Sequence, residues 1–157
     1  MVREEILADL ECAEKLLNKK DHAIVVIRNN EVILTNDGVG IRPLYDVLNH
    51  LGSKGRGCII GSRILGKASA FLCVHAQVGG VFSCEATKTA IAILIRAGIP
   101  GQADKLIEYV RNESGTGMCP FEQMLDGVEL ADEAHAVVSR LLGNNSTISS
   151  VLDNEIQ

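Results

Sequence analysis

Apolar residues in the first quarter of the chain recur at the period of a helix and then in short solid runs. Between residues 6 and 17 they fall three and four positions apart among charged residues, which predicts an amphipathic helix that ends near Lys19 and Lys20. Two apolar runs follow at 23–27 and 32–34, separated by Asn29 and Asn30. Because Asn tolerates the positive φ angles of a tight turn, these runs are predicted to form a β-hairpin.

The rest of the chain alternates between helical and strand patterns, with glycine and proline at the boundaries. The apolar stripe at 44–51 predicts a helix with Pro43 at its start and Gly52 after its end, and 53–57 is interpreted as a flexible basic loop. After this loop we expect a strand from 58 to about 65, a helix from 66 to 75 that Gly79 and Gly80 stop, and a strand at 81–83. An apolar helix over 86–97 follows, and then a strand at 106–110, for which a helix over 104–111 is the alternative. The last two elements are helices over 120–125 and 131–142.

This order of elements predicts the fold class. A hairpin followed by alternating helices and strands is typical of a mixed sheet between helical layers. We therefore expect an α/β fold, a three-layer α/β/α domain over 1–142 with a mixed sheet of about five strands. The chain of 157 residues is long enough for one core and too short for two domains, and the Asn- and Ser-rich stretch 143–157 is predicted to be a flexible tail.

Composition narrows the class of protein. Hydrophobic residues make up 46% of the chain and aromatic residues only 3%, which indicates an aliphatic core. No apolar run approaches the roughly 20 residues that cross a bilayer, and Arg3, Glu4 and Glu5 replace the start of a signal peptide. We therefore expect a cytoplasmic protein with no membrane partner.

Charge and cysteine usage exclude other classes. The net charge is −5 and the basic residues are scattered, so no nucleic-acid partner is expected, although a local basic pocket for a small anion remains open. The five cysteines include no CxxC pair, which argues against a disulfide framework or a zinc knuckle.

One thiol stands where a glycine-rich turn meets a helix. Pro120 fits the first turn of a helix, which leaves Cys119 at the N-cap, where unpaired backbone N–H groups favour a thiolate. Glu122 is expected to oppose that effect by repulsion. Cys119 is therefore a candidate nucleophile, and the alternative is a cysteine that caps the helix and packs beneath Phe121.

Three segments carry a family resemblance: 38–44 (GVGIRPL), 66–72 (GKASAFL) and 115–122 (GTGMCPFE). Together with the order of elements, they make the chain from about residue 4 to 142 similar to DUF1893, a small bacterial family of unknown function in the cytidine deaminase-like superfamily. The resemblance implies the deaminase-like fold. Zinc deaminases carry an HxE or CxE element and a PCxxC element at two helix starts.

The corresponding helix starts lack zinc ligands. They hold Gly40, Ile41, Arg42 and Pro43 in one case and residues 62–67 in the other, with no His, Cys, Asp or Glu in either. The chain is therefore expected to hold no metal and no other cofactor, and not to act as a zinc-dependent deaminase.

Cations stand at those helix starts in place of ligands. Arg42, Arg63 and Lys67, with the Ser62 hydroxyl, predict an anion pocket in which helix N–H groups and fixed positive charges bind phosphate or carboxylate. Gly38, Gly40 and Gly117 are also ligand-binding candidates, because they lie in glycine-containing turns. Neither of the two turns, 38–40 or 115–117, matches a nucleotide-binding motif.

The sequence leaves the activity open. Cys119, Lys67 and Asp37 are the catalytic candidates, while Asp37 is equally interpreted as a turn former before Gly38. We predict that the chain is a metal-free, deaminase-like domain that binds a small anionic, nucleotide-like metabolite. The sequence leaves open whether it is also a group-transfer enzyme. The alternative is a non-catalytic sensing or oligomeric module, because the helix over 86–97 is apolar all round and a homodimer would cover it.

Overall fold

A five-stranded mixed sheet lies between helices in this computed structural model, which describes residues 3–19, 21–112 and 114–143. The strands run in the order β2-β1-β3-β4-β5, with β1 antiparallel to both β2 and β3, and β3, β4 and β5 parallel. The elements are α1 (Arg3–Lys19), β1 (Ile24–Arg28), β2 (Glu31–Asn36), α2 (Arg42–Leu51), the 3-10 helix η1 (Gly52–Gly55), β3 (Ile59–Leu65), α3 (Lys67–Ala76), β4 (Gly80–Thr87), α4 (Lys88–Arg96), β5 (Gly101–Ile107), α5 (Pro120–Met124) and α6 (Ala131–Leu142).

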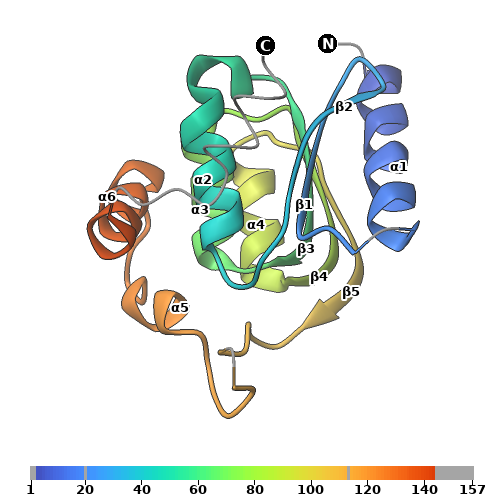
Figure 1. Cartoon of the computed structure of the whole chain (residues 1–157). Coiled ribbons are helices and arrows are strands. Elements are labelled where there is room, and N and C mark those ends of the chain that lie inside the picture. Colours follow the sequence, from blue (N-terminus) through green and yellow to red (C-terminus); the bar gives the residue numbers. More distant parts are fainter. Residues whose placement is uncertain (1–2, 20, 113, 144–157) are drawn as a thin grey trace.

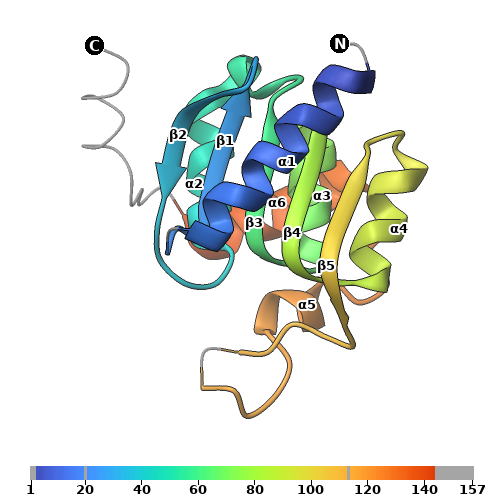
Figure 2. The ribbon, with the colours of Figure 1, turned by 90° about the vertical axis from the view of Figure 1, so that its right-hand side faces the viewer.

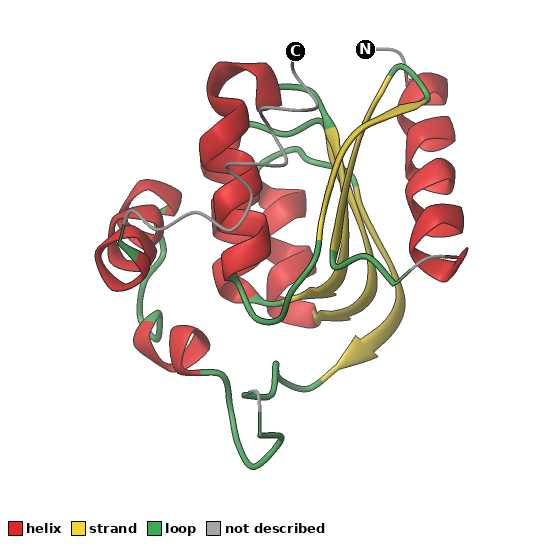
Figure 3. Cartoon of the chain, in the orientation of Figure 1, coloured by secondary structure: helices red, strands yellow, loops and turns green. Residues whose placement is uncertain are grey.

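The helices form unequal layers. Helix α1 alone covers one face of the sheet, over β1, β3 and β4, and α2, α3 and α4 cover the other (Figures 1 and 2). Helix α6 packs on α3 from outside, farther from the sheet than α2 and α3 (Figure 3). The α/β fold with a five-stranded mixed sheet predicted from the sequence is confirmed.

Two separate groups of buried side chains hold the layers together. The larger lies between the sheet and the layer of α2, α3 and α4, and extends to α6 through Ala134 and Val138. The smaller joins α1 to the sheet through Leu10, Leu17 and Phe82. Gly61 permits this close approach, because a Cβ there would lie 2.6 Å from Cγ2 of Val25 and 3.1 Å from the Cβ of Ala13.

The predicted hairpin is present. Asn29 and Asn30 take φ angles of 52° and 65°, which is the backbone of a two-residue turn that matches the twist of β1 and β2. The carboxylate of Asp9 on α1 accepts a hydrogen bond of 2.8 Å from the Asn30 N–H, so α1 also fixes the turn.

Several predicted boundaries are wrong. Strand β4 continues to Thr87, whose hydroxyl accepts from the Ala90 N–H at 3.1 Å and caps α4, so the helix begins at Lys88. Helix α3 ends at Ala76, within one residue of the predicted end, but the residue that stops it is Gln77, with a left-handed φ of 58°, and not the glycine pair. Residues 53–55, expected in a loop over 53–57, belong to the 3-10 helix Gly52–Gly55.

The last strand lies earlier than predicted. Strand β5 covers Gly101–Ile107, and the helical alternative over 104–111 is wrong. Because β5 is the edge of the sheet, polar and partly exposed residues occupy most of it, and no apolar run marks it. The predicted tail lies outside the described residues from 144 onwards. No helix in the described part of the chain is both long and apolar enough to span a bilayer.

A carboxylate after β5 is bonded to the start of α3. Glu122 on α5 accepts from the Lys67 N–H at 2.7 Å and from the Ala68 N–H at 2.8 Å, the first two amides of α3. These amides have no partner within their own helix, and a negative charge is favoured at a helix N-terminus. Gly66 leaves room for this contact, because a Cβ there would lie 2.1 Å from Glu122 Oε1.

Removal of this carboxylate is expected to destabilise the domain. Glu122→Ala leaves two amides without their charged acceptor and should lower the free energy of unfolding by about 1.5–3 kcal/mol. Glu122→Gln keeps one acceptor oxygen and should lose less. Urea unfolding measures both, with Glu129→Ala as the control at an exposed acid, expected within about 0.5 kcal/mol of wild type. An equal effect of the two alanine variants would contradict this role of Glu122.

Candidate functional site

A large cavity lies at the edge of the sheet where β2, β3 and β5 end. This edge pocket has a volume of about 1230 Å³ and is lined by residues in 21–24, 37–42, 62–69, 110–122 and by Leu142. Because β1 is antiparallel to its neighbours, its first residues meet the carboxyl ends of the other strands there. Loops at this edge are where ligands bind in many open α/β sheets.

Arg42 occupies the first position of α2 and lines the edge pocket. Its Nη2 donates to the carbonyl of Leu142 at the end of α6, at 2.8 Å, and its Nη1 lies 3.8 Å from Oδ1 of the buried Asp46. The guanidinium therefore holds the start of α2 against the end of α6 while it remains part of the pocket wall.

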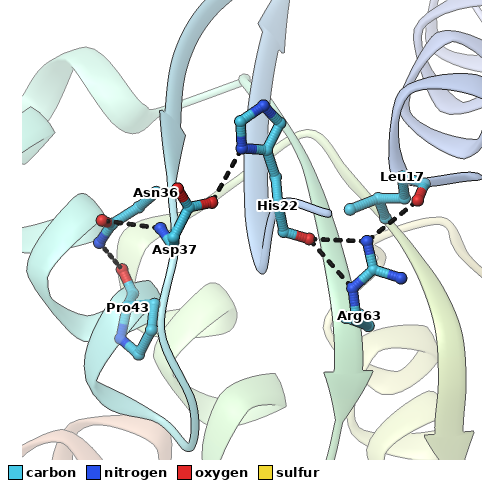
Figure 4. A network of polar contacts seen from close by, with 6 residues as sticks. All are labelled: Leu17, His22, Asn36, Asp37, Pro43 and Arg63. Atoms are coloured by element: carbon cyan, nitrogen blue, oxygen red, sulfur yellow. Dashed lines mark hydrogen bonds and ion pairs between the residues drawn. The ribbon is translucent and has the colours of Figure 1, made fainter. Parts of the chain in front are cut away.

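Arg63 and Ser62 also line the pocket, and both make bonds to backbone. The Arg63 guanidinium donates from Nε and Nη2 to the carbonyl of His22, at 3.1 and 2.9 Å, and from Nη2 to the carbonyl of Leu17, at 3.0 Å (Figure 4). The buried Ser62 hydroxyl donates to the Ile64 carbonyl at 2.7 Å. Arg63 thus fixes the connection from α1 to β1 as well as contributing positive charge to the site.

The structure does not bring Lys67 and Gly117 into the edge pocket. Lys67 does begin α3, but its ammonium lies 6.0 Å from the centre of the Phe71 ring, and its backbone N–H is bonded to Glu122. The expectation that both helix starts are open to an anion therefore needs correction: at α3, a carboxylate of the chain already occupies the first two amides.

The start of α2 differs from that of α3. Ile41, its N-cap residue, makes no side-chain hydrogen bond, and the first turn of α2 contains no acidic residue. The preceding loop lines the pocket and turns at Gly38 and Gly40, whose φ angles are 121° and 76°. Helix N-termini attract anions, so the anion-binding expectation for these two helix starts now concerns α2 rather than α3.

Asp37 lies at the rim of the pocket and faces a histidine. Its Oδ1 is 2.8 Å from Nδ1 of His22, while its backbone N–H bonds to the side chain of Asn36, which in turn donates to the Pro43 carbonyl (Figure 4). The pair is an imidazole oriented by a carboxylate, an arrangement suited to proton transfer. Sequence reasoning missed His22, because 15 residues separate it from Asp37 and only the hairpin brings them together.

Cys119 is the N-cap residue of α5, as predicted, and it lines the edge pocket half-buried. The remaining four cysteines, all within the described residues, do not line it. Burial raises the pKa of the Cys73 thiol to about 12 and also raises the pKa of Cys12, Cys58 and Cys84. Glu85, a further carboxylate on β4, lies outside the pocket lining.

The residues at the two helix starts do not fit the zinc ion that the deaminase resemblance implies. The start of α2 presents backbone and Arg42, and the start of α3 is bonded to Glu122. Within residues 3–19, 21–112 and 114–143, no three side chains of His, Cys, Asp or Glu are grouped so as to hold a metal ion.

Comparisons with known proteins give the chain a family. The family model described as "TM1506: Domain of unknown function (DUF1893)" matches residues 12–142. A crystal structure of a DUF1893 family protein, TM1506 from Thermotoga maritima, is similar with a TM-score of 0.76 and 20% identity, over 88% of this chain and 90% of that one.

Two further solved structures are less similar. Forms 1 and 2 of RibD from Acinetobacter baumannii have TM-scores of 0.48 and 0.47 at 15% and 14% identity, and the likeness covers 63% of this chain but 35% and 36% of theirs. Among curated proteins, none matches the sequence. The assignment made from residues 38–44, 66–72 and 115–122 is confirmed by the family model, and the chain belongs to the DUF1893 family.

Proposed function

We propose that this chain binds a small anionic metabolite of nucleotide-like shape in the edge pocket. The observation that carries the proposal is the pocket of about 1230 Å³ at the strand ends, with the uncapped start of α2 in its wall. Sites for small molecules are typically single large concavities with a few polar groups among apolar ones.

The charges of the pocket support an anionic ligand. Arg42, Arg63 and Arg111 all line it. Among the described residues Arg111 has no ion pair, and its guanidinium lies 5.9 Å from the centre of the Tyr109 ring. Two of the acidic lining residues, Asp37 and Glu122, already face a histidine ring and two backbone amides. Because these two carboxylates already have partners, the positive charge of Arg111 remains available to an anionic ligand.

The apolar part of the wall supports a ligand with a planar or hydrophobic portion. Ile24, Val110 and Phe121 stand in the lining together with the arginines. An aromatic face beside cationic and amide donors is a combination that accepts a base or similar ring next to a phosphate.

Binding of nucleoside monophosphates and of the matching nucleosides by calorimetry tests the proposal. The monophosphates should bind more tightly, and Ser69→Asp should weaken them about tenfold or more, because it places a carboxylate in the lining. The control is Thr89→Asp, which adds the same charge to the first turn of α4 away from the pocket. Equal binding of nucleoside and monophosphate, or equal loss in both variants, would reject an anion site here.

Group transfer through Cys119 is a second candidate function, favoured by the position of this thiol in the pocket wall. A ligand in the edge pocket should slow alkylation of Cys119 by iodoacetamide, read peptide by peptide by mass spectrometry. Cys12 and Cys84, partly exposed elsewhere, serve as internal controls and should be unaffected, and buried Cys73 should not react. Protection without any chemical change in the ligand would favour the sensing alternative over a transferase.

A further inference from the structure

A second cavity lies on the side of α2 and α3 that faces away from the sheet. This α6 cavity has a volume of about 310 Å³, and its walls come from the end of α2, from η1 and the residue after it, from α3 and from α6. Its lining has no residue in common with that of the edge pocket. It therefore requires an explanation of its own.

Two imidazoles meet face to face in this cavity. The rings of His75 on α3 and His135 on α6 have centroids 3.9 Å apart and planes inclined by 16°. Asp132 Oδ1 lies 2.7 Å from Nδ1 of His75, and Ser139 Oγ lies 3.5 Å from Nδ1 of His135. One nitrogen of each ring thus has a partner, and no bond to the other nitrogen is present among residues 3–19, 21–112 and 114–143.

Tyr45 supplies an unpartnered hydroxyl. The residue is 7% exposed, lines the cavity, and its ring centroid lies 6.1 Å from that of His135. No hydrogen bond to its hydroxyl is present within the described part of the chain, and the hydroxyl is not among the buried atoms that lack a partner, so it is open to the cavity. It can therefore donate a hydrogen bond to a group that enters the cavity.

The polar groups around the cavity are predominantly donors. Arg56 lines it with an exposed guanidinium, and the backbone carbonyl of the same residue is fixed by a bond from Arg28 at 3.0 Å. Asn49 and Ser53 add an amide and a hydroxyl. Asp132, the carboxylate next to the rings, already faces His75. Guanidinium, imidazole and phenol donors that converge on a small space suit an oxyanion.

We propose that the α6 cavity is a site for a phosphate group, held between Arg56 on one side and the paired rings of His75 and His135, with the Tyr45 hydroxyl as a further donor. The site is independent of the edge pocket. The phosphate is either the free ion or the terminal group of a small phosphomonoester, since the volume exceeds that of the ion alone.

Protonation of His135 should accompany binding. Burial lowers the pKa of this ring, the neighbouring His75 lowers it further, and Asp132 acts in the opposite direction. The groups that act on the ring are His75 on α3 and Asp132 on α6, while Tyr45 on α2 and Arg56 after η1 share the cavity lining with it. An anion beside the ring favours its charged form, so the pKa of His135 should rise on binding.

Nuclear magnetic resonance of the histidine rings tests the proposal at constant ionic strength. Addition of inorganic phosphate to the whole protein should shift the ring signals of His75 and His135 saturably, and the apparent pKa of His135 should rise. Chloride at equal ionic strength should not. Ribose 5-phosphate in a parallel titration distinguishes a phosphomonoester site, which would bind it more tightly than the free ion.

Point variants separate specific binding from a general charge effect. Arg56→Gln and Tyr45→Phe should each weaken phosphate about three- to tenfold. Lys54→Gln removes a positive charge two residues from Arg56, outside the lining, and should bind as wild type does. Thermal midpoints without phosphate show whether the variants fold.

The outcomes are decisive for each site separately. Unmoved histidine signals, or equal weakening in Arg56→Gln and Lys54→Gln, would overturn the proposal. A phosphate response that disappears in Ser69→Asp and persists in Arg56→Gln would place the anion in the edge pocket and reject the α6 cavity. Loss in Arg56→Gln with no loss in Ser69→Asp supports the α6 cavity, whatever the edge pocket binds.

Discussion

The bond between Glu122 and the first amides of α3 is the interaction on which the arrangement at the strand ends depends. It joins residues 55 and 54 positions apart, and it holds α5, and with it Cys119 and Phe121, against the end of β3. A free helix start at α3 would attract an external anion, and the chain supplies its own carboxylate instead. The start of α2, by contrast, has no acidic residue in its first turn, so the two helix starts at this edge differ in their electrostatic surroundings.

Arginines in this fold carry structural and binding roles together. Arg63 donates to two backbone carbonyls that fix the approach to β1, and Arg42 donates to the last turn of α6. Guanidinium groups can do this because they present several donors in one plane, so bonds to backbone leave positive charge directed elsewhere. The result is a pocket whose cations are held in place by the fold rather than free in solvent.

Local signals in the sequence were sufficient for most elements and insufficient for the site. The pair Asn29-Asn30 identified the hairpin, and α6 begins and ends at the predicted residues, because turn chemistry and helical periodicity are encoded within a few positions. Strand β5 was misplaced because an edge strand lacks the apolar run that marks a central one. The pairs Glu122–Lys67, His22–Asp37 and His75–His135 join distant positions, and neither spacing nor composition records such contacts.

The bond from Arg42 to the carbonyl of Leu142 has a mechanical consequence. Helix α6, a rod of about 18 Å, carries His135 along its length and offers the carbonyl that holds Arg42 at its end. A shift of α6 along its axis must therefore either lengthen the bond between Arg42 and Leu142 or move the Arg42 guanidinium as well. Helix α6 thus contributes to both cavities, through Leu142 to the edge pocket and through His135 to the α6 cavity, and by linkage any effect that occupancy of one has on the affinity of the other must be reciprocal.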